Sequence, residues 1–167
     1  MHKLQAYMKF EIVKLANLSG RKATIYSAIL GDDNQTLLDH FFLENRLAHF
    51  EEVQHIRSQI QTIAHRTGAI ETFFTKYEGI KIGEDVYALY RNNLRLYCFR
   101  IGKSIVLLGG GGWKEVAKWQ NDPKLSQEVN YVRQIAKIID QRIRDRDIRW
   151  NGIELEGDFL FDDEDLE

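Results

Sequence analysis

The alternation of apolar segments and short polar turns between residues 86 and 108 constrains the fold of this 167-residue chain more than any other feature. Apolar segments and polar separators follow one another in the order 86–90, 91–93, 94–101, 102–103 and 104–108. Separators of two or three polar residues are typical of turns between neighbouring antiparallel strands. The pattern therefore predicts a three-stranded antiparallel meander.

Amphipathic helices are predicted on both sides of this meander. Between residues 46 and 67, apolar side chains recur at steps of three and four, and Gly68 supplies a stop. The same periodicity predicts a helix over 124–144, and residues 36–46 also have a helical pattern. Residues 7–15 and 23–30 are predicted to form an N-terminal hairpin, and residues 71–77 an aromatic connector.

These elements predict an α+β fold, with a small antiparallel sheet flanked by helices and an N-terminal extension of a β-hairpin and a helix. The hydrophobic share of 44% agrees with a folded chain. We expect a single domain over residues 1–150, followed by an acidic C-terminal tail over residues 151–167. The alternating apolar residues between 148 and 155 predict one more strand near that boundary.

The net charge of −2 conceals an asymmetry along the chain. All 23 basic residues precede residue 151, whereas eight of the 25 acidic residues follow it. Residues 1–150 therefore carry an excess of about six positive charges, which favours an anionic partner.

Several classes of protein lack support in the sequence. No apolar run approaches the roughly 18 residues of a membrane span, and the N-terminal residues do not resemble a signal peptide, so we expect a cytoplasmic protein without membrane association. The single cysteine, Cys98, excludes an intrachain disulfide and lies on the predicted core face. The five histidines have no metal-ligand spacing, and we expect no metal and no other cofactor.

The middle strand of the meander carries the first candidate site residues. Strand alternation places Arg95 and Tyr97 on one face, and Arg91 has the same parity. A guanidinium group suits phosphate, and a tyrosine offers a stacking ring or a hydroxyl group. The alternative is that Arg95 is a solvated strand residue and Tyr97 a half-buried aromatic.

A run of four glycines follows the third strand. Glycines such as Gly111 and Gly112 can expose backbone N–H groups to an anion, or can simply form a flexible strand exit. Trp113 follows, and if the next segment is helical, Lys114 and Lys118 lie four apart on one face. Trp113 can stack on an unpaired base or pack against the last helix.

The run LRLYCFRIGKSIVLLGGGGWKE, preceded by EDVYALY and followed by KLSQEVNYVRQIAKII, resembles the RelE/ParE superfamily of bacterial toxins, especially its HigB-like branch. The similarity covers about residues 73–139 and implies a RelE-like core over about 46–144. It implies the toxin component of a type II toxin-antitoxin system that cleaves ribosome-bound mRNA without a metal. The implied partners are the ribosome, mRNA and an antitoxin with a helix-turn-helix part, with which the toxin forms an oligomer.

By position in this resemblance, Arg95 matches the arginine that binds the scissile phosphate, and Lys114 matches the basic residue after the last core strand. Lys118 and Tyr97 are weaker matches to catalytic residues. We expect Arg91, Gly111, Gly112 and Trp113 to contact the substrate. The sequence places no histidine within this site, so the group that moves protons is unassigned.

Two alternatives remain open at this level. The fold can serve a catalytically inactive module that recognises RNA or a protein, or a gyrase-directed toxin of the ParE branch. The acidic tail is either a disordered solubilising end or a segment that folds over the basic site and competes with RNA.

Overall fold

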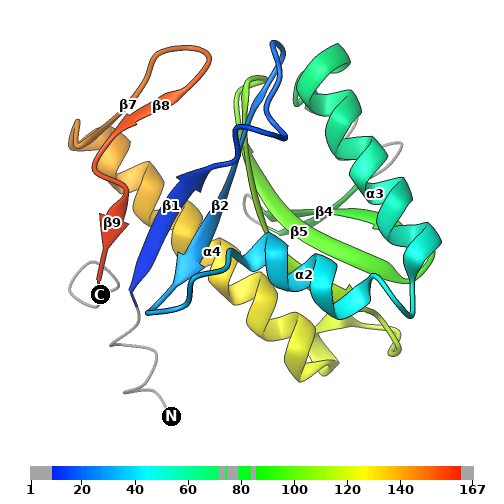
Figure 1. Ribbon diagram of the computed structural model, residues 1–167. Helices are drawn as coiled ribbons and strands as arrows, with labels where there is room; N and C mark the ends of the chain where they lie inside the picture. The colour runs from blue at the N-terminus through cyan, green and yellow to red at the C-terminus, as the bar shows by residue number, and fades with distance from the viewer. Residues whose placement is uncertain (1–8, 72–73, 75–78, 84–85, 163–167) are drawn as a thin grey trace.

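The computed structural model describes residues 9–71, 74, 79–83 and 86–162. Within them lies a seven-stranded mixed sheet with the strand order β3-β4-β5-β6-β2-β1-β9 (Figure 1). In chain order its strands are β1 (Phe10–Lys14), β2 (Thr24–Leu30), β3 (Gly79–Gly83), β4 (Val86–Arg91), β5 (Leu94–Ile101), β6 (Ile105–Trp113) and β9 (Leu160–Phe161). The predicted meander is confirmed as β4-β5-β6, and the predicted N-terminal hairpin as β1-β2.

The sheet is larger than predicted because β2 joins the two hairpins into one layer. β2 pairs with β6 in parallel, and every other neighbouring pair is antiparallel. The fold is therefore mixed α+β, as predicted, although the sheet is neither small nor purely antiparallel. The first residues of the predicted hairpin, most of the aromatic connector and residues 163–167 lie outside the described part of the chain.

Helices cover both faces of the sheet and make two separate cores. On one face, α2 (Leu37–Asn45) and α3 (Phe50–Thr62) cover residues such as Leu89 and Cys98. On the other, α4 (Pro123–Arg144) covers residues such as Tyr97 and Leu107 (Figure 1). The three predicted helices are confirmed, and Cys98 is fully buried as expected.

Local sequence signals set the ends of these helices. Thr36 and Asp39 form a reciprocal capping box at the start of α2, and the Asp122 side chain caps α4 just before Pro123. α3 continues into a π-helical turn, Ile63–Thr67, which ends at Gly68 with a φ of 72°. Gly68 therefore ends the helix as predicted, because its left-handed conformation is readily available to glycine.

The four-glycine run is part of strand β6 and not a loop, which corrects the predicted strand exit. A Cβ atom on Gly109 would lie 2.4 Å from Val132 Cγ2, and one on Gly110 would overlap the Glu128 carboxylate. Gly111 lies at a bulge, where a Cβ would overlap the Arg95 carbonyl oxygen. The glycines are therefore required for α4 and β5 to pack closely on β6.

The C-terminal residues complete the sheet. Strands β7 (Ile148–Trp150) and β8 (Leu155–Gly157) form a separate two-stranded hairpin, with residue 150 at the end of β7. β9 then lies beside β1 (Figure 1), and the Arg142 guanidinium donates to the backbone oxygens of Asp158 and Leu160 at 2.8 and 2.7 Å. Phe161 is buried against Phe10, with ring centroids 5.3 Å apart.

Alanine substitutions in the glycine run separate steric need from flexibility. We expect Gly111→Ala to lower the free energy of unfolding by about 1–3 kcal/mol, because its methyl group must displace backbone. Gly112→Ala is the matched control, since its nearest contact, Leu125 Cδ2, lies at an ordinary 3.5 Å. Urea denaturation measures both changes, and equal stabilities would contradict the steric explanation.

Truncation of Phe161 measures how much the C-terminal segment contributes to the fold. Phe161 is 2% exposed, so Phe161→Ala should cost about 3–5 kcal/mol of unfolding free energy. Leu160→Ala, at a neighbouring side chain that is 60% exposed, should change it by less than about 1 kcal/mol. A Phe161→Ala variant as stable as the wild type would show that β9 is not part of the cooperative fold.

Candidate anion-binding rim

Three of the predicted basic residues lie at one end of the meander, where the β4-β5 turn meets the end of β6. Arg91 and Arg95 flank the turn, but Arg91 pairs with Leu94 and lies on the α3 face, whereas Arg95 pairs with Tyr90 and Gly112 and lies on the α4 face. The Lys114 amide donates to the Asn93 carbonyl at 2.8 Å, and the Asn93 side-chain amide donates to the Lys114 carbonyl at 2.9 Å. We call Arg91, Arg95 and Lys114 the cationic rim.

Arg95 is partly buried and helps to close the turn. Its Nη1 atom donates to the carbonyl of Asn92 at 2.6 Å, and its guanidinium lies 4.9 Å from the centre of the Tyr90 ring. Burial lowers the pKa of Arg95, although a guanidinium stays protonated at neutral pH. Among the described residues, none accepts a hydrogen bond from its Nε or Nη2, so these donors can bind an anion.

Tyr97 does not join the rim. Its side chain is 0% exposed beneath α4, and its hydroxyl group has no hydrogen-bond partner among the described residues. Burial also raises the pKa of this hydroxyl. The predicted surface shared by Arg91, Arg95 and Tyr97 is therefore not formed, because α4 covers Tyr97 and because the β4-β5 register places Arg91 on the other face of the sheet.

The other predicted site residues also occupy different environments from those expected. Gly111 and Gly112 are buried within β6, and residues 114–118 are not helical, so Lys114 and Lys118 share no helical face. Lys118 is exposed just before a short 3₁₀ helix, Trp119–Asn121. Lys118 is therefore an exposed cation beyond the end of β6 and does not belong to the cationic rim.

Trp113 contacts a residue that sequence analysis missed. Its ring stacks on the His49 ring, with centroids 4.0 Å apart and an interplanar angle of 9°. Trp113 lies beside Leu94 in the ladder and packs on the core under α3, on the opposite face from Arg95. His49 precedes α3 by one residue, and no spacing signal in the sequence connects it with Trp113.

Comparison of the chain with protein-family models, curated proteins and solved structures finds no match in any of the three. Within the described residues, His, Cys, Asp and Glu side chains form no group of three that could hold a metal ion. Among the helices of that part of the chain, none combines the length and the apolar character needed to cross a membrane.

A pair of tyrosine substitutions tests whether the Tyr97 hydroxyl is buried without a hydrogen-bond partner. Because this hydroxyl is buried and unpartnered, Tyr97→Phe should leave the free energy of unfolding unchanged or raise it by about 1 kcal/mol. Tyr26→Phe is the matched control, since the Tyr26 hydroxyl accepts a hydrogen bond from the Leu155 amide at 2.9 Å and its loss should cost about 1–3 kcal/mol. Urea denaturation measures both, and a clear loss of stability in Tyr97→Phe would contradict this placement.

Proposed function

We propose that the protein binds RNA phosphates through the cationic rim, as a RelE/HigB-like component of a bacterial toxin-antitoxin system. The observation that carries this proposal is the position of Arg91, Arg95 and Lys114 around one end of the meander, with guanidinium donors of Arg95 left for an anion. Guanidinium and ammonium groups together suit the oxygens of a phosphodiester backbone. The cognate antitoxin in this proposal is a small helix-turn-helix protein.

The order of elements around the rim also supports the proposal. The arginine opens the middle strand, the glycine-containing strand follows, the lysine comes directly after that strand, and a long helix closes the unit. This is the order of the motifs on which the RelE/ParE resemblance depends. It supports a shared arrangement of the phosphate-binding residues.

RNA binding without cleavage is the activity that this rim favours. Attack by a 2′-hydroxyl group needs a nearby side chain that accepts its proton. The Tyr97 hydroxyl is buried, the His49 ring stacks on Trp113 on the opposite face of the sheet from Arg95, and the Glu52 carboxylate at the rim accepts a hydrogen bond from the Asn92 side chain. Ribosome-dependent cleavage of mRNA therefore stands as the second candidate, supported by the resemblance.

Charge reversal at the rim tests RNA binding directly. We expect Arg91→Glu combined with Lys114→Glu to weaken binding of a fluorescent single-stranded RNA at least tenfold. The slope of log K against log salt concentration should fall by about 1.4, because each lost phosphate contact contributes roughly 0.7. Lys137→Glu is the control, since Lys137 is exposed in the middle of α4, away from the rim. An equal loss of RNA affinity in the rim variant and the control, or no loss in the rim variant, would contradict the proposal.

A second experiment separates binding from cutting. The purified protein is incubated with translating ribosomes, and the ends of the mRNA are mapped. New ends that disappear in the Arg91→Glu/Lys114→Glu variant would assign cleavage to the rim. Retained RNA binding without new ends would identify a binding module instead.

A further inference from the structure

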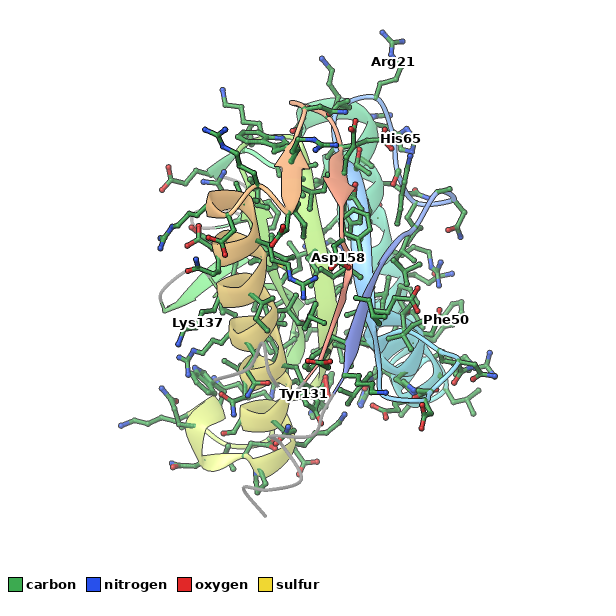
Figure 2. The ribbon with its side chains drawn as sticks, turned by 90° about the vertical axis from the view of Figure 1, so that its left-hand side faces the viewer. Arg21, Phe50, His65, Tyr131, Lys137 and Asp158 are labelled. Carbon is green, nitrogen blue, oxygen red and sulfur yellow. The ribbon has the colours of Figure 1, made fainter. Side chains whose placement is uncertain are left out.

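The end of the sheet opposite the rim carries a second group of exposed basic residues that the sequence analysis did not single out. We call this group the cationic end, and its members are Arg21, Lys22, His65, Arg66 and Lys103. Figure 2 shows Arg21 and His65 at the same end of the molecule, with Phe50 and Tyr131 towards the other. β5 runs between rim and end, and eight residues at roughly 3.3 Å each separate them by about 25 Å.

Backbone contacts hold the three segments of the cationic end together. The amides of Lys22 and Ala23 both donate to the Ala64 carbonyl, at 2.8 and 3.1 Å. This carbonyl belongs to the π-helical turn after α3, a feature frequent at functional sites. The Ala69 amide donates to the Lys103 carbonyl at 2.6 Å, which fixes the β5-β6 turn beside the π-helical turn.

Gly68 shows how closely these segments approach one another. A Cβ atom at this position would lie 2.8 Å from the Lys103 carbonyl oxygen and 3.2 Å from that of Lys22. Gly20 is packed equally closely against the π-helical turn, because a Cβ there would lie 2.5 Å from the His65 Nδ1 atom. The basic side chains therefore project from a fixed platform and not from three independent loops.

The charge of the cationic end is not neutralised by neighbouring acids. Its members come from stretches 15–30, 56–70 and 99–114, which contain no Asp or Glu. In the described part of the chain, no carboxylate forms an ion pair with any of its five side chains. The bordering acids Glu71 and Glu154 lie against Arg100 and Lys14 instead.

An exposed aromatic ring lies next to these cations. Trp150 is 44% exposed, and its ring packs against Gly102, where a Cβ atom would lie 2.6 Å from Cη2. Its Nε1 donates to the Ser104 Oγ at 3.3 Å, so the indole is held on both sides of Lys103. A fixed, partly exposed indole beside unpaired cations is the combination that binds an unpaired base and its phosphates.

We propose that the cationic end, together with Trp150, binds single-stranded nucleic acid. The cations contact phosphates, and the indole stacks on a base. A single strand fits better than a duplex, because bases within a duplex already stack on one another and cannot reach the indole. The rim and the cationic end share no residue, so this inference does not depend on the proposed function.

Charge reversal at the cationic end tests the inference. The probe is a fluorescent oligouridylate of about eight nucleotides, the length of an ordinary single-strand site. Lys22→Glu combined with Lys103→Glu should weaken its binding about tenfold and lower the salt slope by about 1.4. Lys137→Glu is again the control, and thermal melting checks that each variant is folded. Unchanged affinity in the double variant, or an equal loss in the control, would overturn the inference.

The role of the indole has a separate readout. Trp150→Ala should weaken binding several-fold while leaving the salt slope unchanged, because stacking releases no counterions. A fall in the salt slope equal to that of the double variant, or no change in affinity, would overturn the stacking role. The same titration with oligothymidylate shows whether the bound strand is RNA or DNA, since a preference for RNA indicates contact with the 2′-hydroxyl group.

The rim variant separates the two proposals. Loss of binding in Arg91→Glu/Lys114→Glu alone would overturn the inference about the cationic end and leave the proposed function standing. Loss in Lys22→Glu/Lys103→Glu alone would support the cationic end and contradict RNA binding at the rim.

Discussion

The close approach of α4 to the glycine segment of β6 is the contact on which the rest of this structure depends. The absence of side chains at Gly109 and Gly110 leaves room for Val132 and Glu128 of α4. The helix therefore covers the central strands directly and buries a continuous apolar core beneath it. Burial of this kind is the main stabilising contribution in a domain of this size.

This contact also decides which surfaces are left for partners. With α4 on one face and α2 and α3 on the other, strand side chains such as Tyr97 are enclosed, and basic residues of the sheet can meet solvent mainly at its ends. The two ends differ in their charges. At the rim, the Asn92 side-chain amide donates a hydrogen bond to the Glu52 carboxylate at 2.8 Å, whereas the segments of the cationic end contain no acidic residue.

The C-terminal residues show the limits of reasoning from composition. Eight acids and no Lys or Arg in residues 151–167 indicate a solvated tail, yet Phe161 is buried and Arg142 binds the backbone of this segment. Its last strand, β9, lies along β1 at the sheet edge, three strands from β6, and not over the rim. Burial of the Phe161 ring and the hydrogen bonds from the Arg142 guanidinium place this segment against the sheet despite its acidic composition. Apolar burial depends on particular positions and not on average charge.

The sequence by itself determined the local elements. The meander, the N-terminal hairpin, the three helices and the stop at Gly68 follow from turn chemistry and periodicity, which act between near neighbours. The position of Lys114 near the start of β5 comes from the β5-β6 register and its backbone hydrogen bond to Asn93, and not from the helix that the spacing of Lys114 and Lys118 suggested.

Only the tertiary structure decided the parallel β2-β6 pairing, the burial of Tyr97, the His49–Trp113 stack and the joining of Lys22 to Lys103. Each joins residues or elements far apart in the chain, and no local pattern records which of them will meet.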